Sequence, residues 1–193
     1  MLYRRKRQDK DEGYENAGQR LFRSHLCIVV HCFNNFTSNF YYKHYMKKLL
    51  ITLRYDGYNY HGYQVQKNAV TVQEVFQNAV EKVFNKRLDV TGCSRTDSGV
   101  HANMYCVCIE SDMDISNESV IMALNTYLPS DIAVYDCKEV DVDFHPRYSC
   151  KSKEYLYKLY NGKYPNPFLD RYAYWYRFPI DEKYLNEQAQ TFL

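Results

Sequence analysis

Hydrophobic and polar positions follow two distinct periods between residues 48 and 140. Apolar residues recur at i, i+3, i+4 and i+7 over residues 72–86 and again over 117–127, which predicts two amphipathic helices. Thr71 with Glu74 predicts a capping box at the start of the first helix, and Ser116 can cap the second. Short runs rich in β-branched and aromatic residues predict strands. These runs lie at residues 49–55, 88–93, 103–110 and 132–140.

The order of these elements predicts an α+β fold. A β-α-β-β-α-β sequence is typical of the ferredoxin-like (RRM-like) split unit, in which one antiparallel sheet carries both helices on one face. We assign this domain to residues 47–145. The other face of such a sheet is open and available to RNA.

The two flanking regions have a weaker pattern. Residues 1–46 have no sustained period and read as a basic and aromatic, poorly ordered extension with one short strand over 26–31. Met46 resembles a natural start, so the preceding residues are alternatively an artefact of start assignment. Residues 151–160 alternate like a strand, and 172–178 predict an aromatic strand before a helix capped by Asp181.

Composition is that of an ordinary globular protein, with 46% hydrophobic and 25% charged residues. The seven cysteines are an odd number and include no Cys-x-x-Cys pair, which argues against a zinc ribbon and against a secreted disulfide framework. We therefore expect a reducing cytoplasm and no structural metal. The apolar run at residues 26–30 is too short to span a bilayer, so we expect no membrane partner.

Basic and aromatic residues are interleaved late in the chain. Net charge is only +2, yet residues 147–163 mix five Lys and Arg with several of the 21 tyrosines. Cations neutralise phosphates and rings stack on bases, so this mixture fits single-stranded or flipped RNA. The alternative is a half-exposed edge strand on which lysines oppose aggregation.

A compact polar loop, Cys93–Ala102, lies between two predicted strands and carries the candidate chemistry. The spacing of Arg95 and Asp97 lets a guanidinium lie beside a carboxylate, which favours the ionised acid. The structural alternative is a turn, in which Asp97 accepts backbone hydrogen bonds and Gly99 takes a positive φ.

Three segments resemble the TruA-type tRNA pseudouridine synthases. The loop is similar to their Gly-Arg-Thr-Asp-Ala-Gly-Val-His-Ala motif, with Ser94 and Ser98 at two small-residue positions. Residues 55–66 resemble the family's first motif, although Tyr63 stands where tryptophan is usual. Residues 144–149, Phe-x-x-Arg-Tyr-Ser, and the following Tyr155 match a third.

The resemblance implies isomerisation of uridine to pseudouridine in the anticodon stem-loop of tRNA, without a metal or an organic cofactor, by a protein that is a homodimer in its full-length form. It implies that Asp97 is catalytic, as a nucleophile at C1′ or as a base at C2′. His101 we regard as structural, bonding backbone. The residues expected to contact substrate or RNA are Arg95, Thr96, Arg147, Lys153 and Tyr155.

One departure from the family shapes these expectations. Its members carry a second half related to the first, and we read residues 146–193 as the beginning of that half. We therefore expect this chain alone to have low activity or none. Two other functions stay open: a noncatalytic RRM-like RNA-binding module, and an interaction domain whose tyrosines dock a protein.

Overall fold

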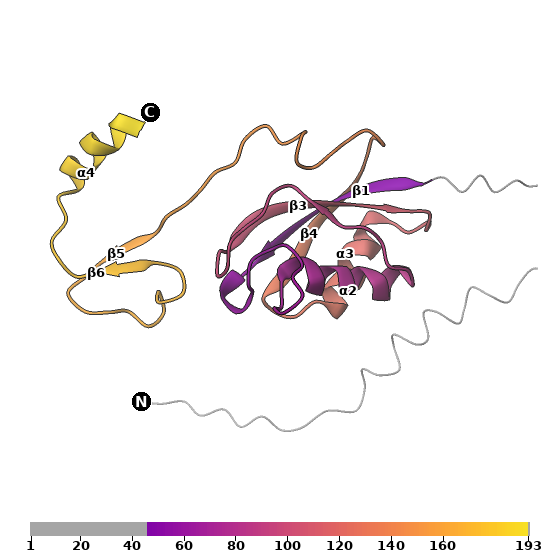
Figure 1. Cartoon of the computed structure of the whole chain (residues 1–193), viewed down its shortest axis with the longest axis horizontal. Coiled ribbons are helices and arrows are strands. Elements are labelled where there is room, and N and C mark those ends of the chain that lie inside the picture. The colour runs from indigo at the N-terminus through magenta and orange to yellow at the C-terminus, as the bar shows by residue number, and fades with distance from the viewer. Residues whose placement is uncertain (1–45, 193) are drawn as a thin grey trace, which may run out of the picture. The chain divides into compact units, whose positions relative to one another are not determined.

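A computed structural model of the chain describes residues 46–192, which contain a four-stranded antiparallel sheet with two helices on one face (Figure 1). The strand order is β2-β3-β1-β4. A short 3₁₀ helix, η1 (Gly57–Asn59), follows the first strand. The strands are β1 (Lys47–Tyr55), β2 (Thr91–Gly92), β3 (Ala102–Ser111) and β4 (Ile132–Val140), and the helices are α2 (Val72–Phe84) and α3 (Asn117–Tyr127). The mixed α/β class and the antiparallel sheet are confirmed.

Helix α2 begins and ends where local chemistry requires. The Thr71 hydroxyl is fully buried and accepts a hydrogen bond from the Glu74 backbone N–H at 3.4 Å, so one half of the predicted capping box is present. Asn85 follows with φ of 51°, a left-handed residue that ends the helix. The helix therefore stops two residues before its predicted end at residue 86.

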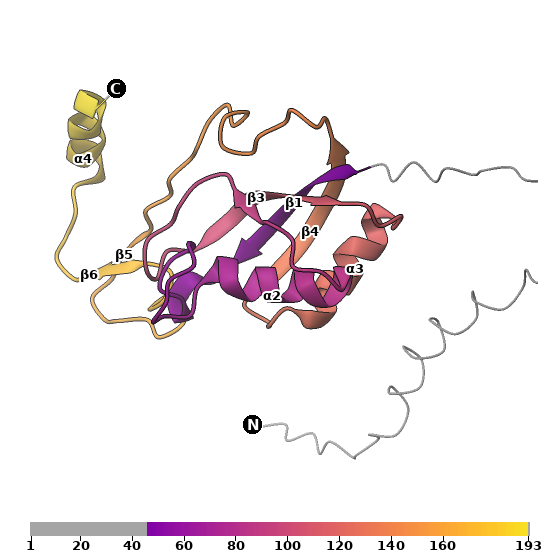
Figure 2. The same ribbon diagram turned by 45° about the vertical axis from the view of Figure 1, so that its right-hand side comes forward.

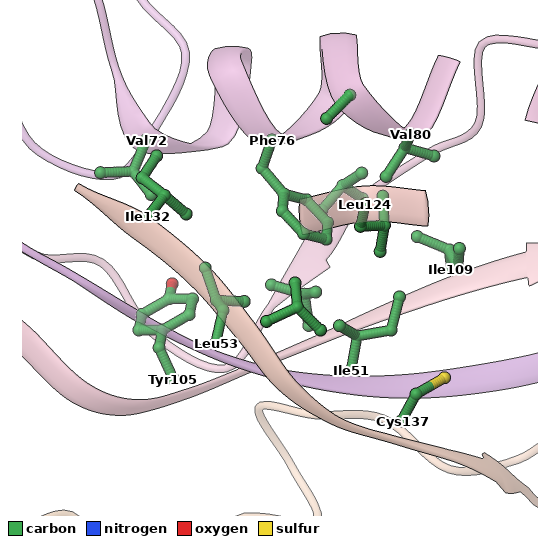
Figure 3. Packing of buried hydrophobic residues seen from close by; sticks show 14 of the residues in the cluster. Ile51, Leu53, Val72, Phe76, Val80, Tyr105, Ile109, Leu124, Ile132 and Cys137 are labelled. Atoms are coloured by element: carbon green, nitrogen blue, oxygen red, sulfur yellow. The ribbon is translucent and has the colours of Figure 1, made fainter. Parts of the chain in front are cut away.

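The core lies between the helices and one face of the sheet (Figure 3). Phe76 of α2 and Leu124 of α3 are fully buried against alternate residues of β1, Ile51 and Leu53. Burying each such side chain stabilises the fold by about 1.5–3 kcal/mol. Both helices therefore contribute to one shared hydrophobic cluster against the sheet.

The second strand is much shorter than the predicted 88–93. The Gln73 side-chain amide donates to the Val90 carbonyl at 2.9 Å, and that of Gln77 donates to the Leu88 carbonyl at 3.1 Å. These carbonyls therefore bond to α2 rather than to β3. The ladder with β3 is limited to Thr91 and Gly92, after which the Cys93 N–H donates to the Cys106 carbonyl of β3 at 2.9 Å.

The prediction of a strand over 151–160 is largely wrong. Residues 151–158 have no regular structure, and β5 (Leu159–Asn161) pairs in parallel with β6 (Tyr174–Tyr176) (Figure 1). The last helix, α4 (Glu182–Ala189), begins after Asp181, whose carboxylate accepts from the Tyr184 N–H, as predicted, and a 3₁₀ turn, η2 (Gln190–Phe192), follows it. The strand predicted at 26–31 lies outside the described residues. None of the helices within 46–192 has the length and apolarity to cross a bilayer.

Candidate active site

The loop between β2 and β3 is fixed through its backbone to the segment that follows β1. The Thr96 carbonyl accepts from the Tyr63 N–H at 3.0 Å, and the Thr96 hydroxyl lies 2.9 Å from the Tyr55 hydroxyl. The Gly99 N–H donates to the Tyr60 carbonyl at 3.1 Å, and the Ser98 hydroxyl donates to the same carbonyl at 3.3 Å. Bonds therefore hold the residues on both sides of Asp97.

Two glycines allow this close approach. Gly62 has φ of 84°, and a Cβ placed there would lie 2.6 Å from the Thr96 carbonyl oxygen. A Cβ at Gly57 would lie 2.0 Å from the carbonyl oxygen of Val100. The loop can therefore reach its position only because these two residues lack side chains.

Three buried tyrosines, Tyr55, Tyr63 and Tyr105, pack together and support the loop. The rings of Tyr63 and Tyr105 are 4.5 Å apart, and those of Tyr55 and Tyr105 are 5.6 Å apart. The Tyr105 hydroxyl donates to the Ser94 carbonyl. Burial raises the pKa of Tyr55 to about 12, so its phenol stays protonated and available to Thr96. The Tyr63 hydroxyl is buried and has no hydrogen-bond partner of good geometry among the described residues.

Asp97 itself is exposed at the tip of the loop. Its carbonyl accepts from the Val100 N–H at 3.2 Å, and Gly99 has φ of 77°, so the turn considered as an alternative is present. Arg95 is also exposed, and within residues 46–192 no ion pair joins it to Asp97. The expected pairing of guanidinium and carboxylate is therefore absent from this arrangement, in which the backbone rather than Arg95 places Asp97.

His101 bonds to backbone on both sides of its ring, as predicted. Its Nδ1 lies 3.1 Å from the Gly57 N–H nitrogen and its Nε2 lies 2.8 Å from the Arg171 carbonyl oxygen. Nδ1 is also 2.9 Å from a carboxylate oxygen of Asp56. Partial burial would raise the pKa of Asp56, but hydrogen bonds from the Tyr58 N–H and the Tyr172 hydroxyl, with the nearby positive groups, lower it overall.

The other predicted contact residues lie on the segment after β4. Tyr155 is 74% exposed, and Arg147 and Lys153 are also exposed. In the part of the chain that the structure describes, no hydrogen bond, ion pair or ring contact joins these residues to Asp97. The structure brings Arg95, Thr96 and Asp97 together and leaves Tyr155 on a separate segment.

Sequence reasoning missed the parts that hold the loop. The tyrosine layer and the Asp56 contact were not predicted, because each depends on residues distant in sequence. Gly57 and Gly62 did carry a signal, since each lies in a polar stretch after a strand where a backbone approach is typical. Among the described residues no group of His, Cys, Asp and Glu has an arrangement that could hold a metal ion.

Comparison with known proteins shows which family and which relatives this chain is similar to. The family model described as tRNA pseudouridine synthase matches residues 51–149, about half of the chain. The chain is similar to "tRNA pseudouridine synthase A" of Pseudothermotoga lettingae, with 41% identity over 76% of this chain and 60% of that protein. Similar proteins of the same name are found in Thermoanaerobacter pseudethanolicus, at 42% over 75% and 59%, and Aquifex aeolicus, at 40% over 76% and 61%. The chain thus spans about 60% of the length of these curated relatives.

Proposed function

Because the chain belongs to the tRNA pseudouridine synthase family, we propose that it carries the catalytic loop of an enzyme that isomerises uridine to pseudouridine in tRNA. The observation that carries the proposal is the Arg95-Thr96-Asp97 loop. It presents an exposed carboxylate on a backbone held at Thr96 and Gly99. A catalytic group needs such fixed placement, because small displacements of a reacting group cost large factors in rate.

In this reaction Asp97 acts at the ribose, either as a nucleophile or as a base. The N1–C1′ bond of uridine breaks, the uracil turns, C5 bonds to C1′ and loses its proton, and N1 takes up a proton. As a nucleophile the carboxylate attacks C1′ as N1 leaves and is displaced when C5 bonds to C1′; as a base it removes a proton at C2′ as N1 leaves and returns it when C5 bonds to C1′. Either form requires the target nucleotide to leave its stack.

The remaining contacts follow from residue chemistry. Arg95, exposed beside Asp97, occupies the space that the flipped nucleotide leaves. Tyr155 stacks on the uracil or hydrogen-bonds to it, and Arg147 and Lys153 neutralise phosphates. Thr96 holds the loop through its bonds to Tyr55 and Tyr63 and lies next to Asp97, where the substrate binds.

We further infer the finer architecture and setting. The order β2-β3-β1-β4, with both helices on one face, supports a ferredoxin-like half whose open face receives RNA. The anticodon arm as substrate, a homodimer and a cytoplasmic setting follow from the family resemblance. Exposed aromatic side chains on residues 155–178 fit a surface that RNA or another chain covers.

The test uses tRNA labelled with tritium at C5 of uridine and the full chain of 193 residues in excess. Excess protein makes a slow single turnover measurable. Release of tritium reports loss of the C5 proton, and we expect Asp97→Asn to abolish release while tRNA affinity stays within about threefold. Affinity for tRNA should fall as salt rises.

Two outcomes favour the other functions. Salt-dependent tRNA binding without release, unchanged by Asp97→Asn, would make the chain an RNA-binding module. Absence of salt-dependent binding would favour a protein-docking domain. Met122→Gln serves as a control, because the Met122 side chain is 71% exposed on α3 and lies outside the proposed site.

A further inference from the structure

The loop that precedes β6 docks on the end of β1 through contacts that the proposed reaction does not use. His101 Nε2 lies 2.8 Å from the Arg171 carbonyl oxygen, and the Tyr172 hydroxyl donates to an Asp56 carboxylate oxygen at 2.9 Å. The rings of His101 and Tyr172 are 5.3 Å apart. The Arg171 guanidinium lies 4.4 Å from the centre of the Tyr58 ring. Figure 2 shows this loop beside η1.

The two ring nitrogens of His101 have different hydrogen-bond partners. Nε2 faces a carbonyl oxygen, which only accepts, so Nε2 carries a proton. Nδ1 accepts from the Gly57 N–H at 3.1 Å and lies 2.9 Å from an Asp56 carboxylate oxygen. The ring therefore bridges the turn after β1 and the docked loop.

The docked loop is connected to the segment that carries Tyr155. Two residues after Tyr172, the Tyr174 N–H donates to the Lys158 carbonyl at 2.8 Å, where β6 begins to pair with β5. Lys158 is three residues after Tyr155. The position of the docked loop therefore limits where Tyr155 can lie relative to Asp97, which is four residues before His101.

We propose that His101 and Asp56 are positioning residues, which hold the loop at Arg171 and Tyr172 so that the Tyr155 segment approaches the Asp97 loop in the orientation that the reaction needs. This inference rests on the proposed function. It assigns the pair no contact with substrate. Its effect is on turnover, through the placement of a tyrosine, rather than on tRNA affinity.

A matched pair of substitutions separates docking from folding. In His101→Asn the shorter amide keeps an oxygen near the Nδ1 position, where it can accept from the Gly57 N–H, but it cannot reach Arg171. In His101→Gln the amide nitrogen lies near the Nε2 position and can donate to the Arg171 carbonyl. Tyr172→Phe removes only the hydroxyl that bonds to Asp56.

The docking can be read without any reaction, because Trp175 in β6 is the one tryptophan of the sequence. Time-resolved anisotropy of Trp175, excited where tyrosine does not absorb, reports motion of this segment on the nanosecond scale. We expect His101→Asn and Tyr172→Phe to add a fast component that the unaltered chain lacks. His101→Gln should restore the slow decay relative to His101→Asn, and Met122→Gln, an exposed position on α3, should leave it unchanged.

The second measurement is tritium release with saturating protein. We expect His101→Asn to slow release by about tenfold or more while tRNA affinity changes less than about twofold, with partial rescue in His101→Gln. An unchanged anisotropy in His101→Asn would overturn the docking. A faster decay with unaltered release would overturn the positioning role. Absence of release from the unaltered chain would refute catalysis by this chain alone and, with it, the positioning role in this chain, whereas the anisotropy would still decide the docking.

Discussion

Replacing Gly62 with alanine tests whether the close backbone approach places the Asp97 loop. The substitution meets two obstacles. The residue has φ of 84°, and the new Cβ would lie 2.6 Å from the Thr96 carbonyl oxygen. Both obstacles lie in backbone, which cannot turn aside as a flexible side chain would.

The magnitude follows from the separate contributions. A left-handed φ costs an L-residue about 1–2 kcal/mol. Overpacking against fixed neighbours adds about 1–3 kcal/mol. Alanine also restricts the unfolded chain, which returns about 0.4–1 kcal/mol. We therefore expect Gly62→Ala to lower the free energy of unfolding by about 3 kcal/mol.

Gly99→Ala is the matched control. Gly99 also has a positive φ, of 77°, but a Cβ there would meet nothing within 4 Å. Only the conformational cost applies, so we expect a loss of about 1 kcal/mol or less. The difference between the two variants, about 2 kcal/mol, isolates the contact with Thr96.

Urea unfolding followed by circular dichroism measures both values, and tritium release measures the effect on the loop. Gly62→Ala should slow release even under conditions where the protein remains folded, because the Thr96 carbonyl must shift and Asp97 follows it. Equal destabilisation by the two substitutions would refute the argument, since the close approach would then contribute nothing.

Three further predictions use the same unfolding assay. Tyr63→Phe removes a buried hydroxyl that has no partner of good geometry among the described residues, so stability should hold or rise by about 1 kcal/mol, and a clear loss would show that the hydroxyl is bonded. Asn125→Ala should cost about 1–3 kcal/mol and promote aggregation seen by light scattering, because the Asn125 amide bonds both the N–H and the carbonyl of Val134 in β4. Asp56 has a lowered pKa in the folded protein, so its stabilisation is complete above the unfolded value near 4 and is lost as the pH falls through the folded value. The stability difference between the unaltered chain and Asp56→Asn should thus be constant above about pH 5 and shrink below about pH 4, and a difference that grew on acidification would contradict the sign.

The sequence predicted correctly those elements whose form depends on residues that are neighbours in the chain. The Thr71 cap, the apolar spacing of α2 and the full extent of β4 follow from neighbouring residues, and the structure has them as predicted. The strand at 88–93 was mostly wrong, because Gln73 and Gln77 bond its carbonyls from the helix. The hydrophobic pattern of the sequence cannot show that side chains of a helix take the carbonyls that a neighbouring strand would otherwise bond.

The strand predicted after β4 was wrong for a different reason. Residues 151–160 alternate correctly for a strand, but alternation describes one chain, whereas a strand needs a partner for its backbone. In the described residues of this stretch, backbone pairing with β6 begins only at the Lys158 carbonyl and continues through Leu159–Asn161. The predicted ion pair between Arg95 and Asp97 was wrong for a similar reason. Their spacing in the sequence permits the contact, but the backbone of the turn determines where the two side chains lie.

The abundance of tyrosine has two physical explanations, which the sequence alone does not separate. Tyr55 and Tyr105 are buried, and their hydroxyls bond to Thr96 and to the Ser94 carbonyl. Burial raises the pKa of each, so these phenols remain protonated and act as a fixed support for the loop. Tyr155 and Tyr157 are exposed on a segment without regular structure, and their rings are free to stack on bases. Tyrosine therefore occurs in two settings in this chain: buried, where it supports the Asp97 loop, and exposed, where it is available for the RNA contact that we propose. Tertiary contacts decide which setting each tyrosine has.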